Sequence, residues 1–157
     1  MKRNKLLVAG AAALSVLGLA STAVIVLGQE EEATEAAREH VTPLSQLGPA
    51  ATATDVWSLQ CGLGTSRARA DVLDLGGVDG RRFIVTLTDS HGRAVSRTGN
   101  DGGASSLDIL LSSGPGNYLV YVSKTSAGTF ENYNSIVHCE TSIGGAVAHN
   151  IMLVQNQ

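Results

Sequence analysis

The chain has 157 residues, a formal net charge of −3 and 4% aromatic residues. This length holds one domain of ordinary size with short appendages and is too short for two. From Ala51 onward, seven basic residues stand against nine acidic ones, so the chain has no basic field of the kind that binds nucleic acid.

The N-terminus has the pattern of an export signal. Lys2, Arg3 and Lys5 precede an uncharged, mostly apolar run that begins at Leu6 and ends at Gly28. A run of about 20 apolar residues can also span a bilayer as a helix, so residues 1–28 are either a signal peptide or a membrane anchor. In both cases we expect the rest of the chain outside the cytoplasm. It is secreted or periplasmic in the first case, and in the second this run alone contacts the membrane.

Residues 29–54 lack the alternation of a strand. The sequence QEEEATEAAREH over residues 29–40 favours a solvated helix, because Glu and Ala form helices well and no apolar stripe is present. Residues 41–54 contain Pro43, Gly48 and Pro49 among small residues and are typical of a linker. We therefore predict an acidic helical arm and linker over residues 29–54 and a folded domain over residues 55–157.

From residue 55 the chain reads as short strands separated by glycine-rich turns. Apolar residues alternate in DVWSLQC (55–61), RARADVLDL (67–75), RFIVTLTD (82–89) and ENYNSIVHC (131–139), and a short strand is expected at residues 151–154. The stretch SLDILLSSGPGNYLVYVS (106–123) reads as a hairpin with a Gly-Pro-Gly turn. Six to eight such strands predict an all-β fold, a jelly-roll-like antiparallel β-sandwich. The residues expected in its core are Trp57, Leu59, Phe83, Val85, Leu87, Leu107, Ile109, Leu111, Tyr118, Val120, Tyr133 and Val137.

The two cysteines, Cys61 and Cys139, have the inward parity of their strands. In an oxidising compartment this predicts one disulfide between them. Closing the long loop would stabilise the fold by about 4 kcal/mol in the chain-entropy model.

The order of these strands resembles the bacterial pre-peptidase C-terminal domain, a jelly-roll-like β-sandwich found on secreted proteins. The segment Asp89-Ser90-His91-Gly92 is similar to the Asp-x-Gly turn of that family, with one extra residue, and residues 116–120 (GNYLV) are similar to its Gly-x-Tyr-x-Val strand. The resemblance covers residues 55–139. It implies a non-catalytic accessory module used for binding or solubility.

The sequence contains few features typical of catalytic or metal-binding sites. The sequence has no G-x-S-x-G, S-x-x-K or H-E-x-x-H motif, so no catalytic residue is predicted. The four histidines, His40, His91, His138 and His149, lack the spacing of metal ligands. Four aspartates at strand ends or in glycine loops make Ca²⁺ a hypothesis, although Asp-Gly is also ordinary turn chemistry. They are Asp74, Asp79, Asp89 and Asp101.

The leading interpretation is an exported, non-catalytic β-sandwich module that binds an extracellular or envelope partner. Two alternatives stay open. The chain could be a structural subunit of an extracellular filament or surface layer that self-associates by strand addition, through its apolar last strand or through residues 41–54. It could also be a small secreted enzyme or inhibitor.

Overall fold

Every regular element in the part of the chain that this computed structural model describes, residues 40–103 and 105–157, is a β-strand. The predictions of a signal or anchor over residues 1–28 and of a helical arm over residues 29–39 fall outside the described residues. Among the described residues, no helix has the length and hydropathy needed to cross a membrane.

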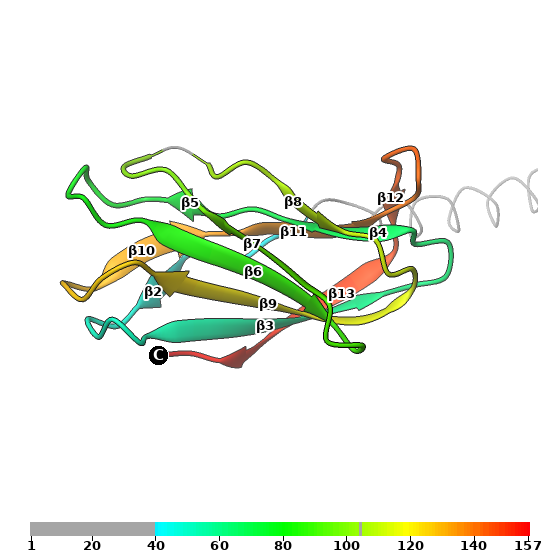
Figure 1. Cartoon of the computed structure of the whole chain (residues 1–157), viewed down its shortest axis with the longest axis horizontal. Coiled ribbons are helices and arrows are strands. Elements are labelled where there is room, and N and C mark those ends of the chain that lie inside the picture. Colours follow the sequence, from blue (N-terminus) through cyan, green and yellow to red (C-terminus); the bar gives the residue numbers. More distant parts are fainter. Residues whose placement is uncertain (1–39, 104) are drawn as a thin grey trace, which may run out of the picture. The chain divides into compact units, whose positions relative to one another are not determined.

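The strands form two layers with all pairings antiparallel (Figure 1). One layer is a single five-stranded sheet, which we call the front sheet. Its order is β13 (His149–Gln155), β3 (Thr54–Cys61), β9 (Gly116–Lys124), β6 (Phe83–Asp89) and β7 (Ala94–Thr98).

The opposite layer consists of two sheets, one of five short strands and one of three. The first has the order β1 (His40–Val41), β11 (Ile136–Glu140), β4 (Arg67–Ala70) and β8 (Ile109–Leu111), with β12 (Ala146–Val147) also paired to β11. The second has the order β2 (Ser45–Leu47), β10 (Glu131–Asn134) and β5 (Leu73–Asp74). The all-β sandwich predicted from the alternating pattern is confirmed.

Alternating side chains fill the space between the layers. In β6, Phe83, Val85 and Leu87 are buried, and Ile84 and Thr86 between them are only half-buried. Of the twelve predicted core residues, all but Leu107 are buried. Leu107 is 69% exposed, because the pairing of this segment with β4 begins only at Ile109.

The segment before Ile109 is held by another contact. Ser106 donates its backbone N–H to the Val72 carbonyl and accepts the Val72 N–H on its hydroxyl oxygen. Ser106 is therefore the buried residue here, and period-2 alternation does not extend back to Leu107.

The predicted hairpin over residues 106–123 is wrong. Strand β8 pairs with β4 in one layer, whereas β9 pairs with β3 and β6 in the front sheet. The turn at residues 112–115 therefore carries the chain from one layer to the other. Both strands turn apolar faces to the same core, and that pattern is the same for a hairpin and for a crossing between layers.

Residues 41–54, expected to be a linker, belong to the fold. Strands β1 and β2 pair with β11 and β10, and the Leu47 side chain is completely buried. The Gly48 N–H also donates to the carbonyl of Gln157. Pro43 lies between these two short edge strands, and Gly48 and Pro49 follow the second one, where a missing backbone donor costs little.

The predicted disulfide is confirmed. Cys61 at the end of β3 is bonded to Cys139 in β11, with a Cα–Cα distance of 5.7 Å. Both cysteines are buried, and the bond joins the two layers through the core.

Candidate functional site

A shallow groove of about 560 Å³ crosses the outer face of the front sheet. Its floor comes from β3, β9 and β13, and the turn after β6 forms one wall. The residues that line it are Ser58, Gln60, Asp89, Ser90, Asn117, Tyr118, Leu119, Asn150 and Met152.

The strand register aligns three amide side chains across this groove. Gln60 of β3 is paired with Asn117 of β9 on one side and with Asn150 of β13 on the other. Directly paired residues point to the same face of a sheet, and all three residues are exposed. We call them the amide row. Each amide offers two N–H donors and a carbonyl acceptor.

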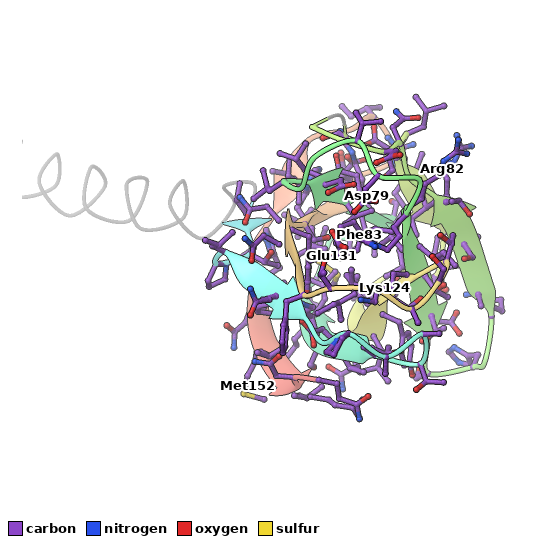
Figure 2. The ribbon with its side chains drawn as sticks, turned by 90° about the vertical axis from the view of Figure 1, so that its left-hand side faces the viewer. Asp79, Arg82, Phe83, Lys124, Glu131 and Met152 are labelled. Atoms are coloured by element: carbon purple, nitrogen blue, oxygen red, sulfur yellow. A yellow bond between two sulfur atoms is a disulfide. The ribbon has the colours of Figure 1, made fainter. Side chains whose placement is uncertain are left out.

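A second row runs beside the amide row, two residues along each strand. Ser58 of β3 is paired with Leu119 of β9 and with Met152 of β13. Leu119 is 37% exposed and Met152 is 59% exposed, and Figure 2 shows Met152 at the margin of the sandwich, directed toward solvent. We call these three residues the apolar row, which the small hydroxyl of Ser58 interrupts. Neither row contains a charged side chain.

Asp89 is the one acidic residue among those that line the groove, and its carboxylate is fully engaged. One oxygen accepts the backbone N–H groups of His91 and Arg93, both at 2.9 Å. The other accepts the Arg93 Nε at 2.7 Å and the Ser113 hydroxyl. The Ser113 hydrogen bond, together with those from Arg93 and His91, holds the pKa of Asp89 well below its usual range.

A group of buried polar side chains lies at one end of the sandwich (Figure 2). Lys124 and Glu131 are 4% and 6% exposed. The Lys124 Nζ donates to the Thr129 carbonyl at 2.9 Å, and the Arg81 Nε donates to Glu131 at 2.5 Å. Buried charges must be paired or hydrogen-bonded, and these contacts satisfy both Lys124 and Glu131. The group therefore has a structural role in connecting neighbouring loops.

A second ionic group lies on the outer face of the opposite layer. Glu140 accepts hydrogen bonds from the Arg67 Nε at 2.6 Å and from His138, with 2.8 Å between His138 Nε2 and Glu140 Oε1. Burial raises the pKa of the Glu140 carboxyl, but these bonds outweigh it and the pKa lies below its ordinary value. His138 therefore acts here as a partner of Glu140.

The four aspartates proposed as calcium ligands do not gather at one place. Asp74, at the end of β5, lies close to the loops of Asp79 and Asp101: Asp74 accepts the Gly102 N–H, and Asp101 accepts the Asp79 N–H. Asp89 lies beyond them, at the far end of β6. Within residues 40–103 and 105–157, no group of three His, Cys, Asp or Glu residues could hold a metal ion. Calcium binding stays a prediction.

Comparison with known proteins gives similarity to solved structures only. No family model matches the chain, and no curated protein matches it. The chain is similar to the pre-peptidase C-terminal domain of a collagenase from Bacillus anthracis, with 20% identity and a TM-score of 0.45 over 63% of this chain and 88% of that one. This domain is of the kind that the sequence resembles.

Two carbohydrate-binding modules are also similar. One is Xyl-CBM35, solved with a glucuronic acid containing disaccharide, with 14% identity and a TM-score of 0.43 over 77% of this chain and 96% of that one. The other is the CBM35 of Cellvibrio japonicus Abf62, with 13% identity and a TM-score of 0.42 over 77% of this chain and 95% of that one. At such identities the likeness concerns the fold alone.

Sequence reasoning singled out Asp89 at the groove but missed the amide row. Asn117 belongs to a strand that is recognised by its apolar residues, and Asn150 precedes the four residues expected as the last strand. The alternation of each strand could have placed two of these residues on the outer face, because Gln60 and Asn117 each lie next to an inward residue, Cys61 and Tyr118 respectively. Which strands are neighbours could not be read from that signal.

Proposed function

We propose that the chain is an exported, non-catalytic binding module that holds a neutral, hydroxyl-rich polymer, such as a polysaccharide, in the groove of the front sheet. The observation that carries this proposal is the alignment of Gln60, Asn117 and Asn150 on three adjacent strands with no charged side chain among them. The groove is open along the sheet face, so a polymer can lie along it without threading.

The chemistry of the two rows suits a sugar ring. Amide side chains donate and accept hydrogen bonds at the same time, as hydroxyl groups also do. The exposed parts of Leu119 and Met152 can contact the C–H face of a ring beside them. A neutral ligand fits better than an anionic polymer because the rows offer no cation to pair with it.

The groove lacks the groups that acid-base catalysis needs. Asp89 stays ionised because its pKa is lowered, and its oxygens already accept four hydrogen bonds. The Tyr118 hydroxyl donates to the Gly114 carbonyl, and burial raises the pKa of this phenol. Neither group is available as a base near neutral pH, which supports a role in binding without turnover.

Export is supported by two features of the chain. The buried bond between Cys61 and Cys139 forms and persists in an oxidising compartment. The N-terminal charges and the apolar run after them have the pattern of an export signal. Cell fractionation with mapping of the mature N-terminus would separate a secreted or periplasmic form from an anchored one, and a purely cytoplasmic chain would contradict the proposal.

Binding can be tested by affinity electrophoresis and calorimetry against neutral, acidic and basic polysaccharides. We expect the chain to bind a neutral polymer, and the Gln60→Ala/Asn117→Ala double variant to bind it at least about tenfold more weakly, since each lost hydrogen bond contributes about 1 kcal/mol. The matched control is Gln46→Ala/Asn132→Ala. It removes two amides that bond to each other on the opposite layer, and its binding should be unchanged. Absence of binding to every neutral polymer would overturn the proposal.

A further inference from the structure

Strand β13 lies at the edge of the front sheet, and among the described residues it pairs only with β3. The Gly62 N–H donates to the Ala148 carbonyl at 3.0 Å, so this residue pair is hydrogen-bonded. Hydrogen-bonded pairs alternate along an antiparallel ladder. Asn150 and Met152 therefore bond to β3, whereas the N–H and C=O groups of Ile151 and Leu153 point away from the sheet.

This edge lacks most of the features that keep a sheet edge from pairing with another chain. The strand HNIMLVQ contains no Lys, Arg, Asp, Glu, Pro or Gly, and such residues are the usual protection. The ladder is regular from His149 to Leu153 and shifts only between Leu153 and Gln155. The opposite edge strand, β7, differs because it carries Arg97 and follows directly on Arg93.

An apolar groove of about 890 Å³ opens next to the free edge of β13. Ile151 and Leu153 line one side of it, and the segment around β2 lines the other. Three large apolar side chains are exposed there, with Val41 at 54%, Leu44 at 67% and Phe130 at 61%. These side chains make the groove a candidate surface for contact with another chain.

We propose that β13 pairs with β13 of a second copy of this chain, antiparallel and across a two-fold axis at Ile151. In this register Ile151 bonds to Ile151 of the second copy, so that its outward N–H and C=O groups are satisfied, and Leu153 lies opposite His149 of the second copy. The strand carries no formal charge, so two copies approach without repulsion. Pairing β7 with itself would bring Arg97 close to Arg97 of the second copy.

The second copy would also cover the apolar groove. Its Ile151 and Leu153 side chains point to the same side of the joined sheet as those of the first copy, toward the region of Val41 and Leu44. A two-fold contact uses the same surface in both copies and therefore stops at a dimer. This separates the proposal from a filament, which needs two different complementary edges.

Dimerisation does not depend on the proposed ligand, but it would change how a ligand is held. Asn150 belongs to the amide row and Met152 to the apolar row, and both lie on β13. In the dimer Asn150 would lie beside Met152 of the second copy on the outer face. The two grooves would then form one continuous platform, on which a long polymer could contact both copies at once.

The proposal can be tested by a cysteine at the two-fold axis. A hydrogen-bonded antiparallel pair has a Cα–Cα distance of about 5.5 Å, which suits a disulfide. We expect the full-length Ile151→Cys variant, oxidised in the cells that express it, to form a covalent dimer on a non-reducing gel. Ser96→Cys on β7 is the matched control, since it is more exposed than Ile151 and should form no covalent dimer on the same gel.

The unmodified chain gives a second measurement that needs no substitution. Purified in the form the cells deliver, it should sediment as a dimer at high concentration and dissociate on dilution. A monomer at all concentrations, absence of the Ile151→Cys dimer in folded protein, or a ladder of larger oligomers would each overturn the two-fold pairing. Loss of polysaccharide binding in a chain that still dimerises would instead contradict only the proposed function.

Discussion

The Tyr133 hydroxyl donates a hydrogen bond of 2.7 Å to the Oδ2 of Asp55, and both residues are completely buried. Tyr133 comes from β10 and Asp55 from β3, so this bond joins the two layers. The Trp57 Nε1 donates to the same hydroxyl at 3.1 Å, and the Gln157 backbone N–H donates to the Oδ1 of Asp55 at 2.9 Å. Burial and the nearby Asp55 carboxylate raise the pKa of Tyr133, which keeps its hydroxyl protonated and able to donate.

The substitution Tyr133→Phe should destabilise the domain with little change in shape. It removes the donor to Asp55 and the acceptor for Trp57, and leaving such buried groups unpaired costs about 1–3 kcal/mol. Urea denaturation followed by Trp57 fluorescence measures the free energy of unfolding. Tyr121→Phe is the matched control because Tyr121 is half-buried on the outer face, and it should change stability by less than about 0.5 kcal/mol. Equal stability of the two variants would contradict the importance of this network.

The domain should lose stability at low pH through Asp89, which lies at the turn after β6. Its pKa is lowered in the folded chain, chiefly by the Ser113 hydrogen bond. The contribution of the ionised Asp89 to stability is therefore fully present above the unfolded pKa of about 3.9. It is lost progressively as the pH falls from there toward the lower pKa of Asp89 in the folded chain. In the Ser113→Ala variant, the decrease in the free energy of unfolding from neutral to acid pH should be smaller than in the unmodified chain. An unchanged acid profile would show that other carboxylates dominate.

The disulfide should account for a large part of the stability of the domain. Reduction frees the loop between Cys61 and Cys139, a sequence separation of 78 residues, and should lower the free energy of unfolding by up to about 4 kcal/mol. Chemical denaturation with and without a reductant measures this effect. The Cys61→Ala/Cys139→Ala variant is the control, because the reductant should not alter its stability. Full stability of the reduced wild-type chain would contradict the role of the bond.

Calcium binding is a separate prediction that a simple measurement decides. If calcium binds among the loops of Asp74, Asp79 and Asp101, excess Ca²⁺ should raise the melting temperature by mass action and a chelator should lower it. Asp101→Asn should abolish the rise. The same melting temperature under all three conditions would leave only the structural role of Asp101, which accepts the backbone N–H groups of Asp79 and Gly80.

The sequence predicted the fold where a local pattern and burial coincide. Strand β6 alternates strictly, so Phe83, Val85 and Leu87 could be placed in the core with no knowledge of their neighbours. The parity of Cys61 and Cys139 in turn predicted a bond through the core. These features depend on one strand at a time, and period 2 is enough to find them.

The candidate site depends on which strands are neighbours, and the sequence carries no local signal for that. Gln60, Asn117 and Asn150 form a row only because β3 lies between β9 and β13. The same lack of partner information led to the hairpin prediction for β8 and β9. Residues 41–54 have the composition of a linker, because proline, here Pro43 and Pro49, is common in linkers and in edge segments alike.

Polysaccharide binding in the groove should be almost insensitive to salt and to mildly acidic or alkaline pH. The amide row and the apolar row contain no charge, and salt screens only interactions between charged groups. Asp89, the acid at the wall, stays ionised across this range because its pKa is lowered. Calorimetry at low and high ionic strength should therefore give the same affinity. A steep loss of affinity with salt would mean that the ligand is anionic and contacts a charged surface outside the groove, such as that around the exposed Arg82.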